Sequence, residues 1–95
     1  MASALPPTQL TTVLATLPGW RIDGQALVRT DHAASFTEAM TWVMRVADAA
    51  EAANHHPDID IRYRQVTWRL STHDAGAITE LDVALAHQID AIVHV

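Results

Sequence analysis

The sequence predicts an α+β protein with two layers, in which three helices pack on one face of a four-stranded antiparallel sheet in the order αββαββα. Three segments carry apolar residues at every third or fourth position, as amphipathic helices do, and two pairs of short runs alternate apolar with polar residues, as half-buried strands do. Because 95 residues of which 49% are hydrophobic suffice for one core, residues 1–95 are predicted to form a single domain.

A short helix and a hairpin are predicted first. Thr8 is a candidate N-cap, and Pro18 with Gly19 ends the helix. The apolar positions of this helix are Leu10, Val13, Leu14 and Leu17. Strands are then predicted at residues 20–22 and 26–33, joined by a tight turn at Asp23-Gly24.

A long helix follows, and it begins at a capping box formed by Ser35 and Glu38. Pro57 blocks its continuation, because proline lacks an N–H and clashes with the preceding turn. The positions predicted to face the core are Phe36, Met40, Val43, Ala47, Ala50 and Asn54, and Met44 is also read as a core residue. This helix is therefore expected to lie with one stripe against the sheet.

The last part of the chain predicts a second hairpin and a third helix. Residues 58–63 and 66–71 alternate apolar with polar side chains, with a short connection at Arg64-Gln65. Thr79 and Asp82 form a second pair suited to capping a helix N-terminus. The helix that follows presents Leu85, Ile89, Ile92 and Val93 to the core.

Composition narrows the classes of function. Six Lys plus Arg against eleven Asp plus Glu give a formal net charge of −5, and the chain has no basic run, so direct nucleic-acid binding is not expected. The absence of cysteine excludes disulfides and a catalytic thiolate. No segment approaches the roughly 20 apolar residues of a membrane-spanning helix, and the N-terminus does not resemble a signal peptide. A cytoplasmic protein without a membrane partner is expected.

The densest polar chemistry lies in Asn54-His55-His56-Pro57, just after the long helix. Pro57 turns this histidine pair off the helix, and His73 closes the strand at residues 66–71, so the three imidazoles can meet in one cleft. Imidazole has an ordinary pKa of about 6.5 and can donate or accept a proton near neutral pH. The pattern therefore indicates acid–base catalysis.

Other readings of these residues stay open at this stage. A histidine pair before a proline can simply cap the C-terminus of a helix, and three histidines can bind zinc. Asp82 reads first as a helix cap, and Asp58 with Asp60 as part of a solvated strand face. Six other residues are predicted to have no functional role. Trp20, Trp68 and Met40 are expected in the core, and His32, His87 and His94 on the surface.

Several of these residues occur in an order that resembles a known signature. Glu51, the triplet His55-His56-Pro57, Tyr63, His73 and Asp82 together resemble the signature of the pterin-4a-carbinolamine dehydratase family; residues 19–20, 36–47, 70–74 and 79–86 also look like family positions. The resemblance implies a dehydratase that converts 4a-hydroxytetrahydropterin to quinonoid dihydropterin in tetrahydrobiopterin recycling. It implies no metal and no cofactor, with a pterin as the substrate, and a homodimer or homotetramer.

The resemblance also implies roles for individual residues. His55, His56 and His73 are the implied catalytic residues; His55 and His73 would transfer protons, and His56 would orient the ring. The implied substrate-binding residues are Asn54, Pro57, Thr72, Asp74, Glu51 and Asp82. Ile59 departs from the tryptophan common at this position. The alternatives are a protein-interaction or dimerisation module with a vestigial site, and a metal-dependent hydrolase on the three histidines.

Overall fold

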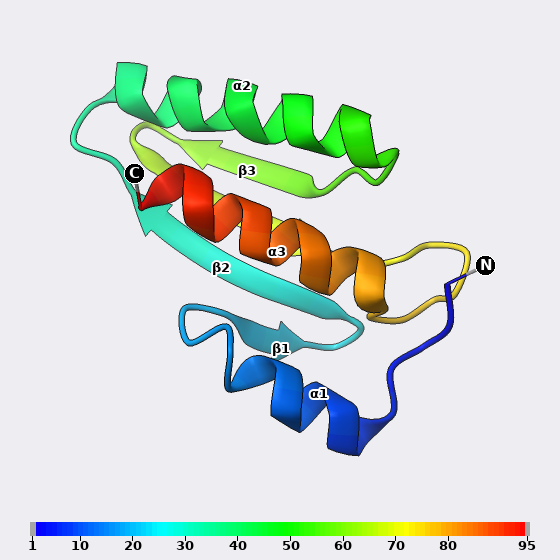
Figure 1. Cartoon of the computed structure of the whole chain (residues 1–95). Coiled ribbons are helices and arrows are strands. Elements are labelled where there is room, and N and C mark those ends of the chain that lie inside the picture. Colours follow the sequence, from blue (N-terminus) through cyan, green and yellow to red (C-terminus); the bar gives the residue numbers. More distant parts are fainter. Residues whose placement is uncertain (1, 95) are drawn as a thin grey trace.

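The computed structural model describes residues 2–94 and confirms the predicted order of helices and strands. The elements are α1 (Pro7–Leu14), β1 (Arg21–Asp23), β2 (Ala26–His32), α2 (Phe36–Ala53), β3 (Asp58–Arg62), β4 (Gln65–Leu70) and α3 (Glu80–Val93). The strands form one antiparallel sheet in the order β1-β2-β4-β3, and the helices pack against one face of it (Figure 1). None of the helices in residues 2–94 is long and apolar enough to cross a membrane.

The core lies between the helices and the two central strands. Alternate residues of β4 are buried, so Val66, Trp68 and Leu70 point toward the helices while the residues between them face the other side. They pack in one cluster with Leu27 of β2 and with residues of all three helices. The predicted burial of Trp20 and Trp68 and the predicted core stripe of α3 are confirmed.

Both hairpin turns lie one residue away from their predicted positions. In the first, Asp23 pairs with Ala26, so the turn is Gly24-Gln25, and Gly24 takes the positive φ of 61°. In the second, Arg62 pairs with Gln65, and Tyr63 adopts a left-handed conformation with φ of 54°. Here a tyrosine supplies the backbone angle that glycine usually provides in such turns.

The first two helices begin differently from the prediction. Pro6, not Thr8, is the N-cap of α1, and Pro7 is its first helical residue, where the missing N–H would have had no intrahelical partner. At α2, Ser35 Oγ accepts from the N–H of Glu38 at 3.1 Å as predicted. The Glu38 carboxylate, however, accepts from the N–H of Ala34 at 2.7 Å, so the reciprocal bond of a capping box falls one residue earlier.

The buried stripe of α2 is rotated from the predicted one. The buried residues are Ala39, Val46 and Ala50, because small side chains allow α2 to approach the sheet and α3 closely. The prediction that Phe36 and Met44 face the core is wrong: their exposed fractions are 48% and 64%. Phe36 instead stacks on Tyr63, with ring centroids 6.5 Å apart. Asn54 is exposed as well, while Met40 is half-buried against the core.

Arg29 of β2 is a buried cation on the helix side of the sheet. Its guanidinium binds Asp31 through Nε at 2.9 Å and Asp90 of α3 through Nη1 at 2.8 Å. Its Nη2 lies 2.8 Å from His94 Nε2, and because arginine only donates hydrogen bonds, His94 accepts this one. These four residues, called the Arg29 network below, join β2 to the C-terminal half of α3.

Two tryptophans and a glycine complete the surroundings of this network. Trp20 Nε1 donates to Asp90 at 2.8 Å, and Trp68 Nε1 donates to Asp31 at 2.9 Å. A Cβ atom at Gly19 would lie 2.5 Å from Arg29 Nη1, so the guanidinium occupies the space that a side chain there would need. Buried indoles and a buried cation thus share the same two carboxylates.

We predict that Arg29→Met lowers the free energy of unfolding by about 3–5 kcal/mol, because Asp31 and Asp90 lose the charge that compensates them. Urea unfolding followed by circular dichroism measures the change. The control is Arg45→Met, because Arg45 is exposed on α2 and makes no ion pair within residues 2–94. Its free energy of unfolding should change by no more than about 0.5 kcal/mol. Equal midpoints for the two variants would contradict this role of Arg29.

Candidate active site

The candidate site begins where α2 ends. Asn54 is the C-cap and adopts a left-handed conformation, with φ 50° and ψ 43°, so the helix stops three residues before Pro57. The chain then turns toward β3, and the two histidines separate: His55 is buried, with 9% of its surface exposed, while His56 is exposed. The histidine pair lies beyond the helix, as predicted, but the helix is ended by the left-handed Asn54 as well as by Pro57.

His55 is held by a buried carboxylate from the first turn of α3. Its Nε2 lies 2.5 Å from Oδ1 of Asp82, which is fully buried. The other oxygen, Oδ2, accepts from Thr72 Oγ1 at 2.8 Å and from the N–H of Thr79 at 2.9 Å. Asp82 thus caps α3 as predicted and also binds the histidine.

This contact determines which nitrogen of His55 is free. A carboxylate only accepts hydrogen bonds, so Nε2 carries the hydrogen that is shared with Asp82. Nδ1 then remains, and it has no hydrogen-bond partner within residues 2–94. A buried carboxylate behind an imidazole fixes the tautomer and the orientation of the ring, so His55 is suited to proton transfer through Nδ1.

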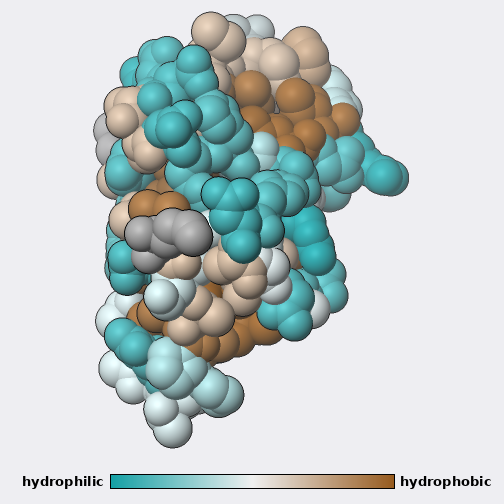
Figure 2. Space-filling model, turned by 90° about the vertical axis from the view of Figure 1, so that its right-hand side faces the viewer, coloured by the Kyte–Doolittle hydropathy of each residue, from teal (hydrophilic) through white to brown (hydrophobic). Residues whose placement is uncertain are grey.

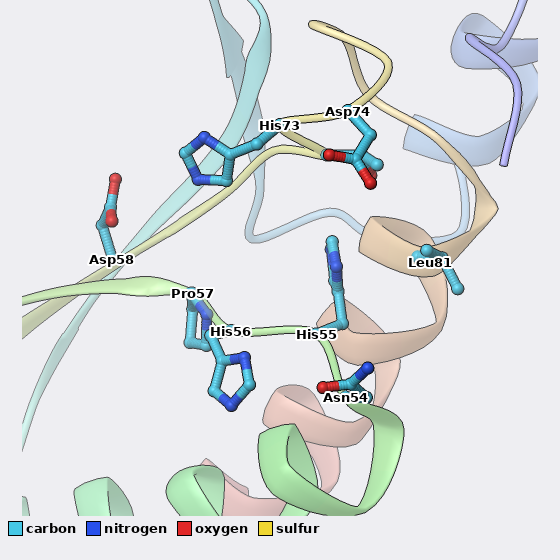
Figure 3. Close-up of a pocket in the computed structure, with 9 residues that line it drawn as sticks. Asn54, His55, His56, Pro57, Asp58, His73, Asp74 and Leu81 are labelled. Carbon is cyan, nitrogen blue, oxygen red and sulfur yellow. The ribbon is translucent and has the colours of Figure 1, made fainter. Parts of the chain in front are cut away.

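The three candidate histidines line one open hollow of about 370 Å³. Figure 3 shows the Asn54–Pro57 turn on one side and His73 with Asp74 on the other. The second side is the turn after β4, which is closed by a bridge between Thr72 and Ala77. The residues that line this histidine hollow are Asn54, His55, His56, Pro57, Asp58, Thr72, His73, Asp74 and Leu81.

The histidine hollow lies at the end of the molecule where α2 ends and α3 begins. In Figure 1 this is the right-hand end, at which the loop before α3 also lies. The same end faces the viewer in Figure 2, where hydrophilic residues occupy the middle of the surface and hydrophobic residues gather above and below. Because His56, His73 and Asp74 of the lining are exposed, a polar ligand can reach the hollow from solvent.

The other predicted site residues differ in their placement. Glu51 is exposed on α2 and pairs with His56 Nε2, outside the lining of the hollow. Asp82 lies behind His55 and does not line the hollow either. Thr72 does line it, although its hydroxyl bonds to Asp82 and to Thr79 Oγ1 at 2.7 Å. These three side chains support the histidines from outside the hollow or from its wall.

Two lining residues were not predicted as part of the site. The sequence predicts Asp58 on a solvated strand face, and it is indeed exposed, but it also lies at the rim of the histidine hollow. Its position directly after the His-His-Pro triplet was the available signal. Leu81, in the first turn of α3, contributes an apolar wall that no sequence pattern indicated.

The arrangement does not provide a metal site in the described part of the chain. Within residues 2–94, no group of three His, Asp or Glu side chains is placed so that it could hold a metal ion. In both His55 and His56, Nε2 is hydrogen-bonded to a carboxylate. The zinc alternative therefore lacks its ligand set here, and the expectation of a metal-free reaction stays a prediction.

Comparisons with known proteins identify the family. The family profile described as pterin 4 alpha carbinolamine dehydratase matches residues 3–92. A protein of Nocardia farcinica is 54% identical over 84 residues, 88% of each chain. A protein of Roseiflexus sp. is 47% identical over 93 residues, 98% of this chain and 100% of that one. Both carry the name "Putative pterin-4-alpha-carbinolamine dehydratase".

A solved structure agrees with these relatives. The crystal structure of a transcriptional coactivator/pterin dehydratase from Brucella melitensis superposes with a TM-score of 0.92 at 31% sequence identity, covering 96% of this chain and 99% of that chain. Sequence and fold thus point to the same relatives over nearly the whole length. With its ordered histidines and its αββαββα fold, the chain belongs to the pterin-4a-carbinolamine dehydratase family, a family of lyases.

Proposed function

We propose that this protein converts a 4a-hydroxytetrahydropterin to quinonoid dihydropterin and water by histidine acid–base catalysis, as part of tetrahydrobiopterin recycling. The observation that carries the proposal is the histidine hollow itself. In a chain of the dehydratase family, two loops separated by a hairpin place His55, His56 and His73 around one ligand-sized space. A homodimer or homotetramer is part of the same proposal.

The reaction requires two proton transfers. Hydroxide leaves C4a poorly, so an acid gives a proton to this oxygen, which departs as water. The lone pair of N5 forms a C4a–N5 double bond as the C4a–O bond breaks, and a base removes one proton from a ring nitrogen. One proton enters the water and one leaves the ring, so atoms and charges balance without an oxidant or reductant.

His55 and His73 are the groups proposed to transfer these protons. His55 is oriented by Asp82 and keeps Nδ1 free, and His73 is exposed on the opposite loop with no side-chain hydrogen bond within residues 2–94. The two rings therefore approach a bound pterin from different sides. Acid–base groups of this kind typically contribute about 10²–10⁴ in rate.

The remaining polar residues are proposed to hold the pterin ring. His56 is fixed at the rim by Glu51 and would orient the ring rather than transfer a proton. Asn54 and Asp74 line the hollow and offer an amide and a carboxylate, which match the mixed donors and acceptors of the pyrimidine part of a pterin. Pro57 makes this turn rigid.

We predict that His55→Ala and His73→Ala each lower kcat by roughly tenfold or more, and that the double variant loses more than either. Stopped-flow absorbance of quinonoid dihydropterin formation measures the rates. His87→Ala is the matched control, because His87 is exposed on α3 and does not line the histidine hollow. A double variant with wild-type kcat would refute the assignment of the acid and the base.

Asp82→Asn tests whether Asp82 acts through His55. The amide keeps the size of the side chain but can donate as well as accept, so it no longer fixes the hydrogen on His55 Nε2, and we predict that kcat falls roughly tenfold while KM changes little. In a His55→Ala background the same substitution should leave kcat unchanged, because the group it positions is gone. Equal losses of kcat in both backgrounds would show that Asp82 serves the fold rather than His55.

A chelator distinguishes this proposal from a metal-dependent hydrolase. We predict that dialysis against EDTA leaves the dehydration rate within error of the untreated protein, since acid–base groups alone supply the chemistry. The measurement is the same absorbance assay with and without added zinc. Activity that disappears with EDTA and returns with zinc would favour the hydrolase instead.

A further inference from the structure

We propose that the C6 substituent of the bound pterin leaves the histidine hollow past Asp58 and lies on the open face of the sheet, where Asp58 selects neutral chains that carry hydroxyl groups. This inference rests on the proposed function and deepens it. It makes Asp58 a specificity-determining residue, a role that the family's histidine signature does not include.

A second hollow lies on the open face of the sheet, opposite the helices. The strand register places Asp58 beside Arg69, Arg69 beside Val28, and Val28 beside Arg21, so one row of side chains crosses all four strands. This row borders a hollow of about 300 Å³, called the sheet hollow here. Its lining also includes Asp23, Asp60 and Thr67.

Asp58 lines both hollows and so joins them. It is the first residue of β3, where the alternation of the strand sends Ile59 toward the core and Asp58 toward the open face. Figure 3 shows its carboxylate directed away from Pro57, on the side of the hollow where His73 lies. A ligand that extends from the histidine hollow onto the sheet therefore passes this carboxylate.

The structure of a pterin fixes where its side chain emerges. C6 is bonded to N5, and N5 is bonded to C4a, so the substituent leaves from a carbon close to the reacting one. The inner side of the hollow is closed by buried His55. In the proposed orientation the C6 chain points away from His55 and leaves over the rim, where the sheet hollow provides room for it beyond Asp58.

Asp58 is the carboxylate of the sheet hollow that is free to bind a ligand. Asp23 is engaged by Arg69 at 3.0 Å, and Asp60 by Arg62 at 3.2 Å. No hydrogen bond or ion pair to the Asp58 carboxylate is present within residues 2–94. A free carboxylate forms strong, charge-assisted hydrogen bonds with hydroxyl donors.

The charges of the sheet hollow also exclude one class of chain. Three carboxylates face two guanidinium groups across its lining, and Asp23 already neutralises Arg69. Asp60 is likewise paired with Arg62, which leaves Asp58 as the unpaired carboxylate beside the histidine hollow. A short C6 chain that ends in a carboxylate would meet like charge there, whereas a neutral polyhydroxylated chain would not. The chemical class that fits is therefore a short chain with vicinal hydroxyl groups.

The test compares two substrates that differ only at C6: the 4a-carbinolamines with a methyl group and with a 1,2-dihydroxypropyl chain. For Asp58→Ala we expect KM for the hydroxylated substrate to rise about tenfold, the effect of losing a hydrogen bond to a charged group. KM for the methyl substrate, which has no hydroxyl group to bind, should change much less, so the ratio of the two KM values measures the contribution of Asp58. Asp58→Asn, whose amide oxygen still accepts, should raise KM by less.

The matched control is Asp48→Ala, which removes an exposed aspartate from α2, outside both hollows, and should change neither KM. If Asp58→Ala changes KM equally for the two substrates, or for neither, the assignment is wrong although the dehydratase function stands. If the wild-type protein dehydrates neither substrate, the proposed function fails, and the role of Asp58 fails with it.

Discussion

The buried carboxylate of Asp82 is the contact on which the site depends. It accepts hydrogen bonds from His55, from Thr72 after β4, and from the N-terminus of α3 at Thr79, so three separate segments meet at its two oxygens. A buried carboxylate without such partners would cost several kcal/mol. The donors offset this cost only when all three segments are in place. The position of His55 in the wall of the histidine hollow therefore depends on the packing of all three segments.

Much of the fold could be predicted because its signals are local. Ser35 and Thr79 cap helix N-termini through hydrogen bonds within one turn. The alternation of apolar and polar residues in β4 predicts which of its side chains are buried. The predictions were wrong where contacts between residues far apart in the sequence determine the structure. Which face of α2 is buried depends on its contacts with α3, so Met44 faces solvent. The second turn depends on Tyr63 accepting a left-handed backbone, which no composition rule indicates.

The candidate site was predictable to a similar extent. The triplet at residues 55–57 and His73 carried a recognisable spacing, and the structure brings them to one hollow. Apart from its position directly after the triplet, Asp58 has the pattern of an ordinary strand aspartate, because its place between the two hollows follows from the pairing of β3 with β4. The Arg29 network was missed for the same reason, since Asp90 and Arg29 are far apart in the chain.

The two indoles bound to the Arg29 network have a spectroscopic consequence. Trp20 and Trp68 are nearly or fully buried, and each donates its N–H to a carboxylate that also binds Arg29. Trp42, half-buried on α2, lies outside these contacts. Two of the three tryptophans thus bind the carboxylates that join the sheet to α3, and their fluorescence emission should respond to these ion pairs. The protein therefore carries its own optical reporter of packing between its two layers, formed by residues that do not line the histidine hollow.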